Sequence, residues 1–377
     1  FIEIKRHALD IDNLLANIKV CDPAIGSGAF PVGMMSEIVK ARLFFLETKC
    51  LDEFYENIEG EKVKRNAYNY KRDCIHNSLY GVDIDPGAVE IAKLRLWLSL
   101  VVDEEDIKTI KPLPNLDYKI MQGNSLLEEY EGIKLIDEKF FKKDDDKTEI
   151  IKSLEHKQKK LQREYYDLHK ARQIDRLTKV RLEKELNRID REIKKIKAPS
   201  KSEEENLSLF ELSEAKKKAD RLLSLQKHYF DSFHKSDKDK LKGEIEHLIW
   251  DLIETTLKEQ GKEDKIKDII RFQKTNTKPF FLWHLYFAEV FQEKGGFDVV
   301  IANPPYLKEY INRRAFDGLR GSPYYQGKMD IWYFFVCKGI DLLKIKEGIL
   351  TFIAQNNWVT SYGASRMRNK VIYRILN

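Results

Sequence analysis

The stretch Ile18-Lys-Val-Cys-Asp-Pro-Ala-Ile-Gly-Ser-Gly-Ala-Phe30 decides the fold. Its first residues, Ile18–Cys21, form a short apolar run that predicts a buried strand, and Ala29–Leu46 has the apolar spacing of a helix. Between them, Gly26 and Gly28 let the chain turn sharply and bring its backbone close to a ligand. A strand, a glycine-rich turn and a helix in this order indicate the start of an α/β domain.

Four further apolar runs continue this pattern. Leu79–Val82 is followed by the apolar helix Val89–Val102, and Tyr118–Met121 completes a βαβαβ order. Such an order predicts a parallel sheet with helices on its faces. The pattern resumes at Gly295–Ile301 and Gly348–Ile353. The sequence therefore predicts an α/β, Rossmann-like fold.

The sequence changes character between the third and the fourth predicted strand. No Gly or Pro occurs from Ile133 to Ala198, and charged residues dominate. Apolar residues at alternating spacings of four and three form a narrow heptad seam, which predicts a helical hairpin or coiled-coil arm. Further helices are expected at Asp220–Tyr229 and Lys240–Lys258. The seam consists of Leu182, Leu186, Ile189, Ile193 and Ile196.

We therefore expect a large charged helical insertion within one α/β domain. Its bounds are residues 137–279, between a cofactor-binding half at 1–136 and a catalytic half at 280–377. Charge runs are usually solvated faces, so we expect the arm to contact another domain of the same protein rather than nucleic acid.

The composition of the 377-residue chain bounds its class. Hydrophobic residues make up 42%, enough for a sizeable core, and a net charge of +5 permits a polyanionic partner without requiring one. The four cysteines lack Cys-x-x-Cys spacing, so neither a disulfide framework nor a metal site is expected. The most apolar stretch, Phe280–Phe291, is too short to span a membrane, and no signal peptide is evident. We expect a cytoplasmic protein with no membrane partner.

Acidic and polar side chains follow the first three predicted strands. The carboxylate of Asp22 suits a cationic group such as an ammonium, and that of Asp83 suits the hydroxyls of a ribose. Asn124 suits an adenine amine, although it is also typical of a turn. Asp85 is expected to cap the next helix, with Pro86 in its first turn. Because ligands bind at the carboxyl ends of strands in such sheets, these residues predict a nucleoside-cofactor site.

Two common nucleotide-binding patterns do not match the glycine-rich turn. Pro31 stands where Gly-x-Gly-x-x-Gly needs its third glycine, and no Gly-Lys-Ser/Thr follows. A purely structural glycine turn is the alternative for this segment taken alone.

The tetrapeptide Asn303-Pro304-Pro305-Tyr306 follows the fourth predicted strand directly. An amine conjugated to a ring is a poor nucleophile, because its lone pair is delocalised into the ring. Two hydrogen-bond acceptors aimed at its N–H bonds would favour the pyramidal, nucleophilic form of the amine as the transition state develops. Asn303 can supply a side-chain oxygen and Pro304 its backbone carbonyl, whose conformation Pro305 restricts. The ring of Tyr306 offers a planar face for stacking. A structural proline-rich strand exit is the alternative.

Together, these motifs resemble the N6-adenine DNA methyltransferase domain of type IIG restriction–modification enzymes. The resemblance covers roughly residues 15–135 and 280–370 and includes Lys328-Met-Asp-Ile-Trp332 and Gln355-Asn-Asn-Trp358. It implies methyl transfer from S-adenosyl-L-methionine to an adenine flipped out of double-stranded DNA. It also implies flanking nuclease and target-recognition domains in the parent chain. The implied cofactor-binding residues are Asp22, Ala24, Gly26, Gly28, Asp83, Ile84, Asn124 and Ser125, and the implied catalytic residues are Asn303, Pro304, Pro305 and Tyr306.

Two other classes remain open from the sequence. The same tetrapeptide serves amino-methyltransferases of protein glutamine or ribosomal RNA, but the Asp22-Pro-Ala opening and Asp330-Ile-Trp332 favour a DNA enzyme. A fragment that binds cofactor and nucleic acid without turnover is the second alternative.

Overall fold

The computed structural model describes residues 2–56, 62–102, 116–137, 188–189, 213–231, 235–275 and 278–376. Five strands form one sheet, and every neighbouring pair in it is parallel. This arrangement confirms the predicted α/β class. In sheet order, the strands are β5 (Ile120–Gln122), β4 (Leu79–Asp83), β1 (Val20–Asp22), β8 (Val299–Ala302) and β9 (Ile349–Phe352).

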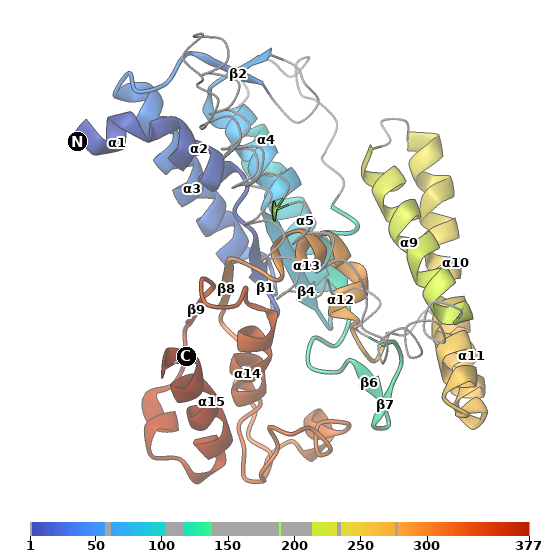
Figure 1. The fold of residues 1–377 in the computed structure, drawn as a ribbon. Coiled ribbons are helices and arrows are strands. Elements are labelled where there is room, and N and C mark those ends of the chain that lie inside the picture. Colours follow the sequence, from blue (N-terminus) through green and yellow to red (C-terminus); the bar gives the residue numbers. More distant parts are fainter. Residues whose placement is uncertain are drawn as a thin grey trace.

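Two layers of helices cover the sheet (Figure 1). Successive strand residues face opposite sides: Val20 and Leu79 belong to one hydrophobic cluster, and Cys21 and Tyr80 to another. The first side is covered by α3 (Ala29–Glu47), α4 (Ala67–Asn77) and α5 (Pro86–Val101), with α2 (Ala8–Ala16) and α1 (Ile2–Arg6) before them. The second side is covered by α12 (Trp283–Tyr286), α13 (Ala288–Lys294) and α14 (Trp332–Leu342).

Two short antiparallel strand pairs lie outside the central sheet. One consists of β2 (Phe54–Glu56) and β3 (Lys62–Lys64), and the other of β6 (Glu129–Tyr130) and β7 (Ile133–Lys134). Four short helices complete the described chain. One of them, η3 (Glu263–Lys265), precedes β8, and the others follow β8 or β9: η4 (Arg313–Phe316), η5 (Asn356–Val359) and η6 (Tyr362–Ala364). The longer helix α15 (Ser365–Leu376) comes last.

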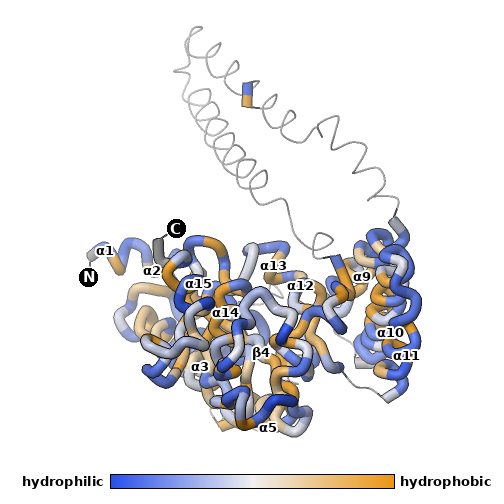
Figure 2. Tube along the Cα trace, turned by 90° about the horizontal axis from the view of Figure 1, so that it is seen from below, coloured by the Kyte–Doolittle hydropathy of each residue, from blue (hydrophilic) through white to orange (hydrophobic). Residues whose placement is uncertain are grey.

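Three helices between β7 and β8 pack beside the β5 edge of the sheet (Figures 1 and 2). They are α9 (Glu214–Asp231), α10 (Lys235–Glu259) and α11 (Ile266–Thr275), and the first two include the helices expected at 220–229 and 240–258. The ring of Tyr229 meets that of Tyr118 edge-on at 4.6 Å, and Lys242 pairs with Asp117 at 2.9 Å. Buried residues of α9 and α10 belong to the same hydrophobic cluster as Tyr80.

Of the predicted heptad seam, Ile189 alone falls within the described residues, where it is helical; the other four positions lie outside them. Among the described helices, none combines the length and the apolar character needed to cross a membrane.

Several element ends differ from those predicted. The strand expected at Gly295–Ile301 begins only at Val299, because Gly295 and Gly296 have φ values of 73° and 148° and end α13. β1 begins at Val20 rather than Ile18 and includes Asp22. Helix α14 was not predicted because it is apolar on nearly all sides and so lacks an amphipathic period.

A buried ionic cluster joins α13 to the sheet. Glu289 accepts hydrogen bonds from the Lys119 ammonium at 2.6 Å and from the Tyr80 hydroxyl at 2.5 Å. Burial opposes ionisation of Glu289, but the charges of Lys119 and Lys19 lower its pKa to about 2. Burial, together with Lys119, lowers the pKa of Lys19 to about 8. Glu289 therefore pairs directly with Lys119, and its charge also favours the charged form of Lys19.

We expect Glu289→Gln to lower the free energy of unfolding by about 3–5 kcal/mol, because it removes the carboxylate that pairs with the buried Lys119 ammonium at 2.6 Å. The contribution is present above the pKa of an unfolded glutamate, about 4.3. It is lost as the pH falls toward the folded pKa of about 2. Urea denaturation at pH 7 and pH 3 measures both effects. Glu3→Gln, exposed on α1, is the control and should change stability by less than about 0.5 kcal/mol. Equal stability of the two variants would contradict this role.

Candidate active site

The carboxyl ends of three neighbouring strands bring the predicted site residues to one edge of the sheet. Asp22 ends β1, and Asp83 ends β4, whose Gly81 lies beside Asp22 in the register. Asn303 follows β8, which pairs with β1 on its other side. Neighbouring strands lie about 4.8 Å apart. The predicted cofactor residues and the predicted catalytic tetrapeptide therefore lie on adjacent strands.

The turn after β1 approaches α5 closely. Gly26 and Gly28 have φ values of 51° and 78°, in the left-handed region that favours glycine. A Cβ at Gly28 would lie 3.0 Å from the Cβ of Ala92, so a larger residue would push the turn away from the helix. The Gly26 amide donates to Asp83 Oδ2 at 2.9 Å, which ties the turn to the end of β4.

Asp22 has the chemistry of a cation-binding group. Its side chain is 1% exposed, and Oδ1 accepts a hydrogen bond from the Ala24 amide at 3.0 Å. Oδ2 is buried and has no hydrogen-bond partner. Burial raises the pKa of Asp22 to about 7, and the neighbouring charge of Asp83 adds to this rise. A buried carboxylate oxygen without a partner is costly unless a ligand donor completes it.

Asp83 has a structural role in addition to the predicted one. Its Oδ2 accepts from Gly26 and its Oδ1 accepts from the Asp85 amide at 2.9 Å. A carboxylate has about four lone-pair sites, so acceptor capacity remains for a ligand. Beside it, the apolar side chain of Ile84 is 65% exposed. The predicted cap is confirmed, because Asp85 Oδ1 accepts from Gly87 at the start of α5.

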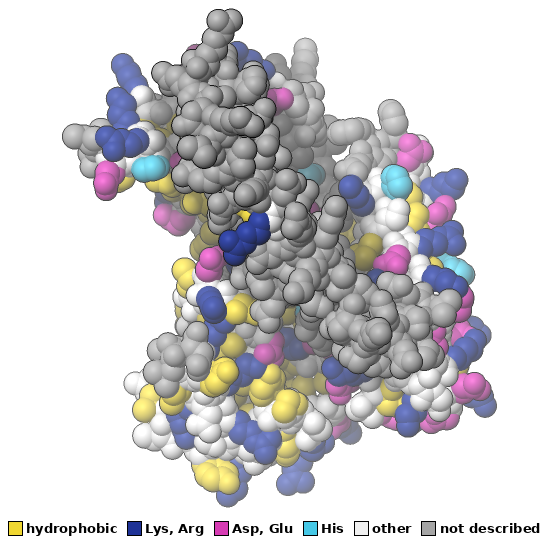
Figure 3. Space-filling model, in the orientation of Figure 1, with side chains coloured by type: hydrophobic (Ala, Val, Ile, Leu, Met, Phe, Trp, Pro, Cys, Tyr) yellow, Lys and Arg dark blue, Asp and Glu magenta, His cyan; other side chains and the backbone are white. Residues whose placement is uncertain are grey.

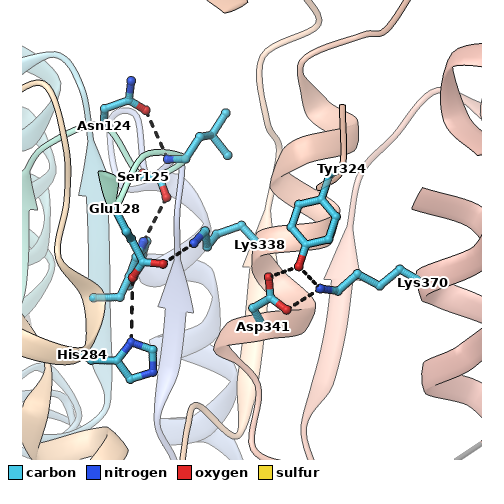
Figure 4. A network of polar contacts seen from close by, with 10 residues as sticks. Asn124, Ser125, Glu128, His284, Tyr324, Lys338, Asp341 and Lys370 are labelled. Atoms are coloured by element: carbon cyan, nitrogen blue, oxygen red, sulfur yellow. Dashed lines mark hydrogen bonds and ion pairs between the residues drawn. The ribbon is translucent and has the colours of Figure 1, made fainter. Parts of the chain in front are cut away.

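The loop after β5 uses its predicted site residues to hold itself in place (Figure 4). Asn124 Oδ1 accepts from the Leu126 amide at 3.2 Å, which is the turn role that the sequence left open. The Ser125 hydroxyl is buried and donates to the Pro23 carbonyl at 2.5 Å, linking the loops after β5 and β1. These contacts place the two residues beside the Asp22 turn.

The tetrapeptide after β8 presents an acceptor and an aromatic ring to solvent. Asn303 is exposed, Pro304 is buried and Tyr306 is 37% exposed. The Tyr306 hydroxyl donates to the Ile353 carbonyl at 2.8 Å and also lies 3.2 Å from Asn303 Oδ1. The Tyr306 hydroxyl has a single proton to share between these two oxygens. At least one lone pair of Asn303 Oδ1 therefore remains available to another donor.

Asp330 is a buried residue whose role the sequence did not reveal, although it lies in one of the segments that carry the resemblance. It forms an antiparallel bridge with Lys308, and the Ile331 amide donates to the Leu307 carbonyl at 2.9 Å. Its carboxylate is buried beside the backbone amides of Ile331 and Trp332, and burial raises the pKa of Asp330. The bridge fastens the chain that leaves Tyr306 to the start of α14.

An ionic network below the site joins three elements (Figure 4). The Glu128 carboxylate pairs with Lys338 of α14 at 2.6 Å and lies 3.8 Å from His284 of α12. Burial opposes ionisation of Glu128, but Lys338 and His284 lower its pKa to about 2. Within the described ranges, no group of His, Cys, Asp and Glu side chains is arranged to hold a metal ion.

Two comparisons relate the sequence of the chain to known proteins. A protein of Methanocaldococcus jannaschii, provisionally named a type II restriction enzyme and methyltransferase, is 27% identical over 96% of this chain. The chain spans 28% of the length of that relative. The model of the Eco57I restriction-modification methylase family matches residues 77–374, from the start of β4 to the last helix. The chain belongs to the Eco57I restriction-modification methylase family.

Proposed function

We propose that this chain is the part of a restriction–modification enzyme that methylates the N6 amine of adenine in double-stranded DNA, with S-adenosyl-L-methionine as methyl donor. The observation that carries the proposal is the placement of two unlike groups on adjacent strands. The partnerless oxygen of Asp22 lies at the end of β1, and the exposed pair Asn303 and Tyr306 follows β8. Membership in a restriction-modification methylase family supports the reaction class.

The residues around β1 and β4 fit the proposed cofactor. Asp22 Oδ2 would accept from the ammonium of the methionine part, which is the donor that this buried oxygen lacks. Asp83 would accept from the ribose hydroxyls, and exposed Ile84 would pack against the adenine ring. The two glycines of the Gly26–Gly28 turn would let the cofactor lie close to the backbone. When bound, the cofactor supplies an electrophilic methyl group on a sulfonium.

The tetrapeptide would prepare the target amine. Asn303 Oδ1 and the Pro304 carbonyl would accept its two N–H bonds, which favours the form with a localised lone pair as the transition state develops. The ring of Tyr306 would stack on the flipped adenine. No strong base is needed before transfer, because the alkylated amine loses its proton readily to water.

The two alternative readings predict different products. Methylation of glutamine or of ribosomal RNA would use the same pair of acceptors, but the matched family and the name of the relative both refer to restriction–modification. Because the chain spans only 28% of that relative, we also propose that the parent protein has nuclease and target-recognition domains.

The charge on Asp22 should control cofactor affinity. We expect Asp22→Asn to weaken binding of S-adenosylmethionine about 10- to 100-fold, because a charge-assisted hydrogen bond contributes about 1.5–3 kcal/mol. In the unaltered protein, affinity should fall as the pH drops through about 7, where the carboxylate is protonated. Binding below that pH should release a proton. Calorimetry in buffers of different ionisation enthalpy measures both effects.

The same substitution has an opposite effect on stability. The folded pKa of Asp22, about 7, lies above the unfolded value of about 3.9, so the ligand-free protein loses stability as the pH rises between these values. Asp22→Asn should therefore be more stable than the unaltered protein at pH 8, by a margin that shrinks toward pH 4. Affinity independent of pH, together with unchanged binding by Asp22→Asn, would remove Asp22 from the site.

Asp83 should matter more for the cofactor than its neighbour Asp85. Asp83→Ala removes the proposed ribose acceptor and also the anchor of the Gly26 amide, so we expect cofactor affinity to fall by about 10- to 100-fold or more. Asp85→Ala is the matched control. It removes only the cap of α5 and should cost about 1 kcal/mol of stability with little change in affinity. Similar affinities of the two variants would assign Asp83 a purely structural role.

The proposed chemistry separates Asn303 from Tyr306. In the intact protein, Asn303→Ala should lower kcat by about 10²–10³-fold, as for a lost preorganised hydrogen bond, with little change in cofactor affinity. Tyr306→Phe keeps the ring and should retain most activity, although it loses the bond to Ile353. Tyr306→Ala should weaken base capture by about 1–3 kcal/mol. Mass spectrometry of nucleosides from treated DNA is the readout. Methylated cytosine, methylated glutamine in place of DNA, or full activity of Asn303→Ala would overturn the assignment.

A further inference from the structure

We propose that the segment Lys308–Arg314, which we call the tip loop, enters the DNA duplex where the target base has left the stack. In this arrangement, Tyr310 and Ile311 fill the gap in the stack, and the cations of the loop contact the phosphates on either side. The inference rests on the proposed function and deepens it by identifying the surface that receives the duplex.

Two large apolar side chains at the apex of the tip loop face solvent. Tyr310 is 72% exposed and Ile311 is 73% exposed. Leu307 and Tyr306 are each 37% exposed, and Lys308 and Glu309 separate them in the sequence from the two residues of the apex. Covering such surface is worth about 25 cal/mol per Å², and contiguous exposed apolar surface marks an interaction site.

The tip loop is held rigidly at both ends. Before the apex, the Glu309 amide donates to the Met329 carbonyl at 2.9 Å, and the Glu309 carboxylate accepts from Tyr325 at 2.6 Å. After the apex, Asn312 Oδ1 accepts from Ala315 at 3.2 Å, and Phe316 is fully buried. A side chain presented by a preorganised loop loses little conformational entropy on binding. The exposed apex is therefore presented by a loop whose two ends are anchored to the rest of the domain.

The charges of the tip loop fit a polyanion. Lys308, Arg313 and Arg314 are exposed, and none of them forms an ion pair with a carboxylate in the described part of the chain. Figure 3 shows basic and hydrophobic side chains interspersed over the lower part of the view, where Figure 1 places α14 and α15. The acidic residues nearby are occupied, since Glu309 is bound to Tyr325 and Asp317 pairs with Arg320 at 2.9 Å. Unpaired cations beside an apolar apex match phosphates beside stacked bases.

The position of the tip loop relates it to base extrusion. The loop continues directly from Tyr306, and the bridge between Lys308 and Asp330 fastens it to α14. Extruding a base costs a few kcal/mol of lost stacking and pairing. A wedge of apolar side chains that enters the vacated space offsets part of this cost. The residue that stacks on the flipped base and the residues that replace it would then belong to one rigid segment.

The first experiment uses the intact protein and the double variant Tyr310→Ser/Ile311→Ser. The control is Leu14→Ser/Tyr373→Ser, which removes side chains of 72% and 70% exposure on α2 and α15. The probe is an oligonucleotide duplex containing the methylation site mapped on plasmid DNA, with 2-aminopurine in place of the target adenine. Its fluorescence rises when the base leaves the stack.

We expect the tip variant to lose most of this fluorescence rise and to methylate the adenine duplex about 10- to 100-fold more slowly, since stacking contributes about 1–3 kcal/mol per base. Cofactor affinity and the control variant should be unchanged. The deficit should shrink when the target lies opposite an abasic site, because that base is extruded at lower cost. A variant that is merely misfolded would not recover in this way.

The second experiment tests the cations. Arg313→Gln/Arg314→Gln should reduce the slope of log affinity for duplex DNA against log salt by about 0.9 for each lost phosphate contact. Lys5→Gln/Arg6→Gln on α1 is the control and should leave the slope unchanged.

The outcomes separate this inference from the proposed function. Methylation of DNA by the unaltered protein, with the same fluorescence and rate in the tip variant and its control, overturns the role of the tip loop alone. Absence of DNA methylation by the unaltered protein overturns both. An unchanged salt slope in the arginine variant would assign the surface to a protein partner and would overturn the DNA contact.

Discussion

Pairing of β1 on both sides is the constraint on which the candidate site depends. β4 and β8 both run parallel to β1, so the chain leaves all three strands at the same edge of the sheet. The register places Asp22 beside Gly81 on one side and Cys21 beside Val300 on the other. A shift of one residue would exchange the two faces of a strand, and the residue that ends β1 would no longer be a buried carboxylate.

Electrostatics at this edge oppose stability and favour ligand binding. Asp22 is buried without a full set of donors, and Asp83 lies close enough to raise its pKa. Glu289 and Glu128 are compensated within the protein, by Lys119 and by Lys338. Asp22 Oδ2, in contrast, has no hydrogen-bond partner among the described residues. Perturbed groups that the fold itself does not satisfy are typical of functional sites.

Much of the fold followed from local sequence patterns. Short apolar runs that end in Asp22 and Asp83 identified the central strands, and the capping role of Asp85 followed from Pro86 beside it. Contacts between distant segments could not be predicted in this way. The bond from Tyr306 to Ile353 joins residues that are remote in sequence, and no local pattern encodes it.

The same limit applies to whole elements. Helix α14 has no amphipathic period because both layers around it are apolar, and only tertiary packing reveals its length. The structural hydrogen bond of Ser125 to Pro23 depends on how two loops meet at the sheet edge. Sequence reasoning therefore predicted which residues lie at this edge of the sheet more readily than it predicted the contacts that hold them.

The shared core of the sheet and helices α9 and α10 has a consequence for how the protein unfolds. Leu222 of α9, Leu252 of α10 and Tyr80 of β4 belong to one buried cluster. Because α9 and α10 contact Tyr118 and Asp117 beside β5, their removal would expose this edge of the sheet to water. We therefore expect the helices and the sheet to exchange their amide hydrogens as one cooperative unit. Helices α9 and α10, which lie between β7 and β8 in the sequence, would thus be an integral part of the domain. Their exposed residues could vary in evolution far more freely than the helices themselves could be lost.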